Sequence, residues 1–282
     1  MNLRHLSARA AVAGITTALA AGALVGVSTT AANAESVTAP YSCSAGSTTL
    51  PIGVTATADL SGYPSLASGT PVSPGLVSLN LTFTVPADVV NALMAPPYNQ
   101  TQIGGGSSDL AFPIGKGSVP IAAFTIDPVQ LVHDTPATLT KQVSNSAFNL
   151  PEAGAAAVTM PASFTLNSIM PLACTTDSKQ VITTYTISKQ TASVTAKAPK
   201  SVKKNKAFSV VVKVAGQNKP ATGKVTAKVG KKTIGTGVLK KGKAAIKVKK
   251  GLKKTSKITF VYAGDKSTAG SSSFPVKVTV KK

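Results

Sequence analysis

Several residue types are rare or missing in this 282-residue sequence. Tryptophan is absent, and 8 phenylalanines and 5 tyrosines are its aromatic residues, so the core must consist mainly of Val, Ile, Leu and Ala. Arginine occurs only at Arg4 and Arg9, which leaves the rest of the chain without the planar side chain that recognises bases or phosphates bidentately. Sequence-specific binding of nucleic acid is therefore not expected. Only 2 histidines and 9 acidic residues are present, which leaves few candidates for acid–base or metal chemistry.

Residues 1–34 have the layout of a secretory signal peptide. Arg4 and Arg9 precede an apolar stretch over residues 10–27. The small-residue triplet Ala32-Asn33-Ala34 then predicts cleavage before Glu35. The alternative, a retained membrane anchor, is disfavoured because Thr and Gly interrupt the apolar stretch and no stop-transfer pattern follows. We expect a secreted mature chain, extracellular or associated with the cell wall, without a transmembrane anchor.

Charge is distributed unevenly along the mature chain. Residues 35–190 contain 4 lysines and 8 acids, for a net charge of −4, whereas residues 191–282 contain 24 lysines and 1 acid, for +23. A break in composition of this size indicates a domain boundary. We predict a first domain over residues 35–187 and a lysine-rich domain over residues 188–282.

The two cysteines, Cys43 and Cys174, both lie in the first domain. In an exported chain, two cysteines most simply form one disulfide. The alternative, a metal-binding or redox pair, is disfavoured because the spacing is far from C-x-x-C and His133 is the only histidine after the signal peptide. We predict a disulfide, no metal site and no cofactor.

Alternation of apolar and polar residues between the cysteines predicts strands. Every second residue is apolar from Leu50 to Ala58, and again from Val77 to Val85. Half-buried strands of this kind need a facing layer, so we predict an antiparallel β-sandwich. Further strands are predicted at residues 119–126, 138–143, 157–160 and 163–169, and a short helix at residues 87–94.

The first domain opens with Tyr41-Ser42-Cys43, continues through alternating strands and closes with Cys174. In these features residues 38–185 resemble a family of exported actinobacterial domains of unknown function. The resemblance brings no known activity with it.

The last 92 residues divide into short alternating runs separated by glycine-containing turns. A further strand is predicted around Ile234. The residues sharing one face in the six main runs are Val194/Ala196, Val210/Val212/Val214, Val225/Ala227/Val229, Ala244/Ile246/Val248, Ile258/Phe260/Tyr262 and Val276/Val278/Val280.

This layout, with the sequence VYAGD at residues 261–265 before the final strand, resembles a bacterial immunoglobulin-like domain. The resemblance implies an immunoglobulin-like sandwich that serves as a spacer, stalk or binding unit. Tyr262 and Asp265 are expected to be structural. The predicted fold class is thus all-β, with two antiparallel β-sandwich domains, the C-terminal one immunoglobulin-like, after a cleaved signal peptide.

Catalytic motifs are scarce. His133 and Asp134 form the only His-Asp pair, and adjacent residues in an extended chain point to opposite faces, so a surface role is expected for His133. Residues 102–110 (QIGGGSSDL) lack the Lys-Ser/Thr ending of a phosphate-binding loop and are expected to form a flexible loop. No catalytic residue is predicted.

The lysine excess has two readings: lysines can simply solvate strand faces, or they can meet a polyanion. A merely solvated surface usually mixes charges of both signs, which makes a polyanionic partner a reasonable inference, but the sequence does not decide between the two readings. Phe208, Phe260 and Phe274 are expected inward or at strand starts, so no aromatic platform for single-stranded nucleic acid is predicted. The candidate polyanion-binding residues are Lys228, Lys231, Lys232, Lys240, Lys241, Lys247, Lys249, Lys253 and Lys254.

Three functions follow from these observations. The leading one is a non-catalytic, cell-envelope-associated protein whose basic domain binds anionic wall polymers or acts as a spacer. The alternatives are an adhesin whose first domain binds a specific ligand, and an enzyme with a wall-targeting module. The sequence does not specify the ligand or the oligomeric state.

Overall fold

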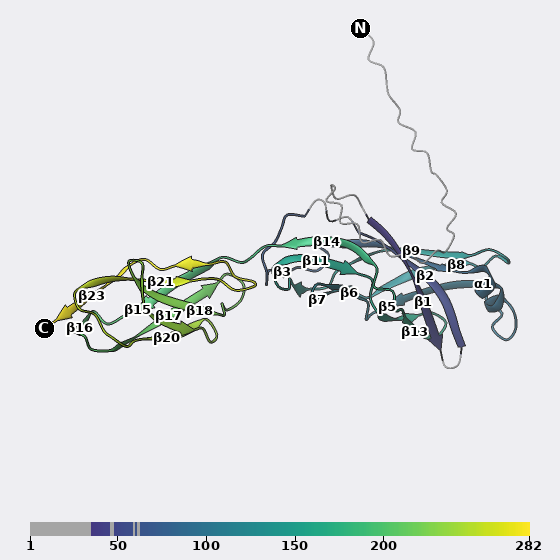
Figure 1. The fold of residues 1–282 in the computed structure, drawn as a ribbon. Coiled ribbons are helices and arrows are strands. Elements are labelled where there is room, and N and C mark those ends of the chain that lie inside the picture. The colour runs from purple at the N-terminus through teal and green to yellow at the C-terminus, as the bar shows by residue number, and fades with distance from the viewer. Residues whose placement is uncertain (1–34, 46–47, 59, 61–62) are drawn as a thin grey trace, which may run out of the picture. The chain divides into compact units, whose positions relative to one another are not determined.

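The computed structural model describes residues 35–45, 48–58, 60 and 63–282, so the predicted signal peptide lies outside the described residues. The described chain consists of β-strands and one helix (Figure 1). Its elements up to residue 187 are β1 (Glu35–Ala45), β2 (Thr48–Ala58), β3 (Pro71–Val72), β4 (Ser78–Val85), α1 (Ala87–Met94), β5 (Gln102–Ser107), β6 (Ala111–Ile114), β7 (Gly117–Pro120), β8 (Phe124–Gln130), β9 (Ala137–Ser144), β10 (Phe148–Asn149), β11 (Gly154–Thr159), β12 (Ser163–Asn167), β13 (Pro171–Thr175) and β14 (Val181–Ile187). The later strands are β15 (Ala192–Lys197), β16 (Ser201–Lys203), β17 (Phe208–Gly216), β18 (Lys224–Val229), β19 (Lys232–Val238), β20 (Lys243–Val248), β21 (Ser256–Tyr262), β22 (Ser271–Ser272) and β23 (Val276–Lys281).

The largest sheet has eight strands in the order β8-β5-β12-β13-β1-β2-β4-β9. Its edge strands, β8 and β9, approach each other, so the sheet is nearly barrel-shaped. A four-stranded sheet, β14-β11-β6-β7, and the pair β10-β3 accompany it. The expected pair of facing sheets is therefore replaced here by one strongly curved sheet. Strand twist accumulates over eight strands and brings the two edges together, so that the sheet covers its own apolar face.

The two clearest sequence patterns of the first part are confirmed. β2 buries Ile52, Val54, Ala56 and Ala58, and β4 buries Leu79, Leu81, Phe83 and Val85. The predicted helix is α1, which begins after Pro86 and buries Val89, Val90 and Leu93. Local alternation and a proline at the helix start were sufficient signals for these three elements.

Residues 102–110 do not form the expected loop, because Gln102–Ser107 is strand β5. It lies inside the eight-stranded sheet, paired with β8 and β12. A side chain at Gly106 would collide with the carbonyl oxygen of Phe124 on β8, so glycine permits this close strand approach. Three consecutive glycines carry no apolar side chain, and the sequence therefore shows no alternation there.

The single strand predicted at residues 119–126 is two strands in different sheets. β7 ends at Pro120 in the four-stranded sheet, and β8 begins at Phe124 in the eight-stranded sheet. Between them, the N–H of Ala122 bonds to the carbonyl of Ser144. The chain crosses from one sheet to the other over three residues, which a local apolar pattern cannot reveal.

Cys43 on β1 and Cys174 on β13 form the predicted disulfide. The two residues are direct partners in the antiparallel pair and are fully buried. Tyr41 packs edge-on against Phe164, with 5.1 Å between ring centroids, and its hydroxyl donates a hydrogen bond of 2.6 Å to the carbonyl of Pro161. The disulfide thus joins neighbouring strands that are 131 residues apart in sequence.

The lysine-rich part contains a three-stranded sheet, β15-β17-β20, and a second sheet, β16-β23-β21-β18-β19, with β22 paired to β21. β16 and β23 are parallel, and the other pairs are antiparallel. Residues of both sheets meet in one core that includes Val210, Ile246 and Phe260, each 0% exposed. All six predicted apolar faces point inward as buried or half-buried residues, and β19 is the predicted strand around Ile234.

Asp265 organises the turn that follows β21. Its carboxylate accepts hydrogen bonds from the backbone N–H groups of Thr222, Ser267 and Thr268, at 2.7 to 2.9 Å, and from the Thr222 hydroxyl at 2.7 Å. Partial burial alone would raise the pKa of Asp265, but these hydrogen bonds outweigh it and hold the pKa well below its usual range. Burial, reinforced by the Asp265 charge, raises the pKa of Tyr262 to about 12. Both residues have structural surroundings, as expected.

Buried apolar residues form two clusters, one from Ala39 to Ile187 and one from Val194 to Val278. The clusters fall on either side of the break in charge composition. The exact boundary at residues 187/188 stays a prediction.

Removing the disulfide should destabilise the first part of the chain. For Cys43→Ala/Cys174→Ala we expect an unfolding free energy about 3–5 kcal/mol lower, because the unfolded chain loses a crosslink that closes a long loop. Differential scanning calorimetry should show one transition lowered by about 10 °C or more and a second transition, from the lysine-rich part, unchanged. A double variant that melts like the parent would contradict this expectation.

Asp265 should stabilise the second part in a pH-dependent manner. Since its pKa is depressed on folding, its contribution is fully present above the unfolded pKa of about 4 and declines progressively as the pH falls from there through the lower folded pKa. Asp265→Ala should cost about 1–2 kcal/mol at pH 7, because the backbone donors of a partly exposed turn lose their acceptor, and the difference should shrink at pH 3. Urea unfolding of both proteins at the two pH values measures this. The control is Asp265→Asn, which keeps one acceptor oxygen and should lose less; an equal loss at both pH values would rule out the carboxylate charge as the cause.

Candidate functional site

The structure distributes the nine candidate lysines over different surfaces of the lysine-rich sandwich. Lys247 is on the outer face of the three-stranded sheet, and Lys228 is on the outer face of the other sheet. Lys240 and Lys241 occupy the turn between β19 and β20. The remaining five lie in or directly beside the turns at the opposite end of these strands. The candidates therefore do not form one continuous surface.

The five lysines at that end are joined by others that the sequence did not single out. We call this group the basic tip. All of its members are exposed, and the set is Lys203, Lys204, Lys206, Lys231, Lys232, Lys249, Lys250, Lys253, Lys254, Lys281 and Lys282. β16 and the end of β23 lie together at one end of the domain (Figure 1). Four of the lysines belong to these strand ends or directly follow them.

Backbone contacts bring the segments of the basic tip together. The N–H of Lys204 bonds to the carbonyl of Lys281 at 3.1 Å, and the N–H of Asn205 bonds to the carbonyl of Leu252 at 3.0 Å. Gly251 has a positive φ of 59° and lies directly against the backbone of Lys206, an approach that leaves no room for a side chain. These contacts join the β16–β17 loop, the β20–β21 loop and the end of β23.

The turn before β19 reaches the same end of the domain. Gly235 of β19 lies against Ile246 and the backbone of Lys247 on β20, and Gly237 lies against Ile246 and the backbone of Ala245. β19 therefore runs antiparallel to β20, which places the turn at Lys231 and Lys232 beside the end of β20. Four segments remote in sequence thus present lysines together.

No acidic side chain balances the basic tip within the described residues. The ion pairs found there are Lys116–Glu152, at 3.2 Å, and His133–Asp134, both outside the lysine-rich part. Asp265 follows the far end of β21, roughly 20 Å from the tip along a strand that rises about 3.4 Å per residue. That separation exceeds the Debye length of about 8 Å at physiological ionic strength, so the tip retains its positive potential.

Lysines also oppose one another on the two sheet faces. Lys213 of β17 is the direct partner of Lys243 of β20, and Lys257 of β21 is the direct partner of Lys277 of β23. All four side chains are exposed. Like charges at directly opposed positions destabilise an antiparallel pair, so the domain carries electrostatic strain that a solvated strand face does not require.

Phe274 departs from the expectation for the aromatic residues. Phe260 is buried and Phe208 half-buried, but Phe274 is 92% exposed, two residues before β23. One isolated exposed ring provides no stacking surface for successive bases. The interactions available to the tip are thus those of flexible ammonium groups, which attract anions as point charges.

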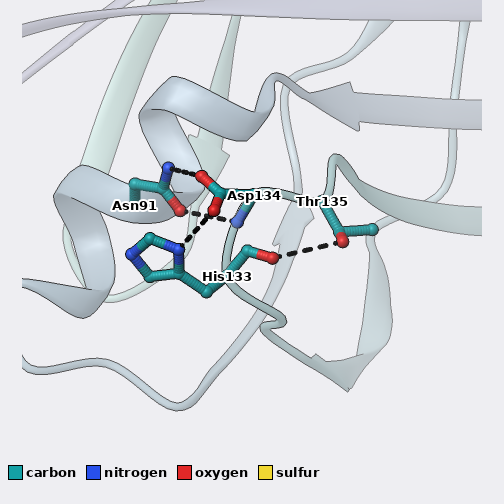
Figure 2. Close-up of polar contacts among 4 residues, drawn as sticks. All are labelled: Asn91, His133, Asp134 and Thr135. Carbon is teal, nitrogen blue, oxygen red and sulfur yellow. Dashed lines mark hydrogen bonds and ion pairs between the residues drawn. The ribbon is translucent and has the colours of Figure 1, made fainter.

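His133 and Asp134 do contact each other, contrary to the expectation for an extended chain (Figure 2). Asp134 has a positive φ of 58°, so the chain turns there and brings its Oδ2 atom within 2.9 Å of His133 Nδ1. The amide of Asn91 donates to Asp134 Oδ1 at 2.7 Å and its oxygen accepts from the Asp134 N–H at 2.9 Å. These hydrogen bonds, with the nearby imidazole, lower the pKa of Asp134.

This cluster fastens the turn before β9 to α1. The side chains of His133 and Asp134 are 67% and 78% exposed, and the Thr135 hydroxyl donates to the His133 carbonyl at 3.3 Å and not to the imidazole (Figure 2). Because water surrounds the pair, nothing there concentrates its electrostatic effect on a substrate. The described residues contain no group of three or more potential metal-ligating side chains.

Comparison with known proteins identifies one part of the chain. Residues 194–281 match the family model described as Bacterial Ig-like domain (group 3). No curated protein matches the chain. The resemblance of residues 38–185 to an exported actinobacterial family finds no support in these comparisons.

The match agrees with the two sheets and the shared core of the lysine-rich part. A domain of this family and a disulfide in the same chain indicate an extracytoplasmic location. Among the described residues, no helix is long and apolar enough to cross a membrane. Residues 194–281 are thus a bacterial immunoglobulin-like domain of group 3, carried by a surface or secreted bacterial protein.

Proposed function

We propose that this is a non-catalytic protein of the bacterial cell envelope, held there by binding of the basic tip to an anionic envelope polymer. The observation that carries the proposal is the meeting of eleven exposed lysines from four segments at one end of a domain whose only acid lies at the other end. A folded domain maintains such self-repulsion at a cost in stability, and a polyanion removes the cost. Wall polymers with repeated phosphate or carboxylate groups fit this surface.

The absence of arginine from the mature chain supports diffuse electrostatic attraction to a polyanion and not specific recognition of a single phosphate or carboxylate group. Lysine ammonium groups are strongly hydrated point charges on flexible stems, whereas bidentate recognition of one phosphate uses the guanidinium fork. Binding of this kind depends on counterion release and weakens steeply with salt. The partner is accordingly a polymer class and not a sequence-specific nucleic acid.

A non-catalytic role is supported by the surroundings of His133. Its one side-chain hydrogen bond among the described residues is to Asp134, and both side chains face solvent. An enzyme with a wall-targeting module would need a pocket that groups His133 with further carboxylates. The adhesin alternative depends instead on ligand binding by the first part of the chain.

Retention on isolated cell walls should be lost at about 0.5 M salt, where the Debye length is well below 10 Å. The key variant changes Lys231, Lys232, Lys253 and Lys254 to Gln, which removes four charges from the tip. We expect the slope of log affinity against log salt to fall by about 3, since each neutralised phosphate contributes about 0.7–0.9. Walls stripped of phosphate polymers by hydrofluoric acid separate phosphate from carboxylate partners.

The matched control changes Lys213, Lys240, Lys241 and Lys266 to Gln, which removes the same charge away from the tip. This control should keep most of the retention and a slope close to that of the parent. Retention that is insensitive to salt, or absent at low salt, would refute the proposal. Equal losses in the two variants would show that net charge acts without the tip.

A further inference from the structure

The nearly barrel-shaped sheet encloses an apolar cavity of about 120 Å³. Seven of its eight strands and α1 contribute to the wall. The residues that form the interior are Ile52, Phe83, Val85, Val89, Leu93, Ile103, Ile126, Leu139, Leu166 and Leu172. Protein cores are normally packed without spaces of this size. The interior of a closed eight-stranded sheet is either filled by side chains or holds one small ligand.

The chemistry of the wall restricts what can enter. No charged side chain lines the cavity. Three lining residues carry a hydroxyl group: Thr48 and Tyr98 are exposed, and the hydroxyl of Ser168 already donates to the carbonyl of Gly104 at 2.7 Å. A peptide segment would bring amide groups that find no partner there, and an ion would lose its hydration. By contrast, an apolar engineered cavity of about 150 Å³ in another protein binds benzene. The occupant must therefore be hydrocarbon.

Most of the exposed residues that line the cavity are apolar as well. Three large apolar residues line the cavity and are also exposed to solvent. They are Tyr98 in the loop after α1, which is 38% exposed, and Ile169 and Met170 in the β12–β13 turn, which are 51% and 43% exposed. Single exposed apolar residues are common, but three at the rim of one apolar cavity form a continuous path from the interior to the surface. A compact ring would fill the cavity and leave this rim uncovered, whereas a chain would cover both.

We propose that this cavity binds one unbranched alkyl chain of a lipid-like amphiphile. The terminal methyl end lies among Val89, Phe83 and Leu139, the following methylenes contact Tyr98, Ile169 and Met170, and the polar head remains in solvent. Since no lysine lines this site, the inference is independent of polyanion binding by the basic tip. It gives the first part of the chain a ligand class.

Binding can be measured with N-phenyl-1-naphthylamine, an uncharged probe that brightens in apolar sites and has no electrostatic attraction to the lysines. Linear alcohols from hexanol to tetradecanol should displace it. Affinity should rise about 4-fold per added methylene, as expected for transfer of a methylene group out of water, and then level off once cavity and rim are filled. Decanoate and decyltrimethylammonium should bind within a few-fold of each other, because the head is outside.

Two variants localise the site. Ile169→Ser/Met170→Ser changes exposed residues, should leave folding intact and should weaken dodecanol binding at least about 10-fold. Val89→Phe fills the interior and should abolish binding. The control Val181→Ser changes a side chain that is 48% exposed on β14 and outside the cavity lining, and it should bind like the parent.

The proposal would be overturned if linear alcohols did not displace the probe from the parent protein saturably and with one-to-one stoichiometry. The proposal would also fail if the Ile169→Ser/Met170→Ser variant bound dodecanol as tightly as the parent, or if the affinity for linear alcohols did not depend on their chain length. If Val89→Phe does not fold, the rim variant decides the outcome alone. Salt should have no effect on dodecanol binding, so failure here and failure of wall retention are distinguishable.

Discussion

The structure depends on burial of apolar side chains at every second position of its strands. Without tryptophan, the core is assembled from small aliphatic residues and a few phenylalanine and tyrosine rings, and the longer strands β2, β4 and β17 contribute three or four of these residues each. The inward positions fix which face of each strand is hidden, and the outward positions are then free to vary. In the immunoglobulin-like domain every charged residue at an outward strand position is a lysine. Fold and charge are thus specified by alternate residues of the same segments.

This separation explains how much of the fold was predictable. β2, β4, α1 and the six main strands of the immunoglobulin-like domain (β15, β17, β18, β20, β21 and β23) each carry a local apolar pattern, so their positions could be predicted from neighbouring residues, whereas the short strands β16 and β22 carry none. The position of β5 could not be predicted in this way, because Gly104 to Gly106 have no side chains that could alternate. Glycine fits there because the backbones of β8 and β12 approach closely, which the local sequence does not show. The curvature that brings β8 and β9 together results from eight strands jointly, and no single one of them encodes it.

The candidate site shows the same limit. Lys231, Lys232, Lys249, Lys253 and Lys254 were identified because they crowd one stretch of sequence, yet Lys240 and Lys241 in that stretch lie at the other end of the sandwich. Lys203, Lys204 and Lys206 were not identified, because only the hydrogen bonds to Leu252 and Lys281 bring their loop to the tip. The apolar cavity is likewise invisible in the sequence, since its walls use the same Leu, Ile and Val residues that fill a solid core.

The directly opposed pairs Lys213–Lys243 and Lys257–Lys277 have a consequence for where the domain is most stable. In dilute solution their repulsion favours unfolding, and a dense polyanion acts as the counterion that relieves it. A ligand that binds only the folded form shifts the folding equilibrium by mass action. Under the proposed binding to an anionic envelope polymer, the immunoglobulin-like domain would resist unfolding and proteolysis best while adsorbed, and molecules released from that polymer would be the first to be degraded.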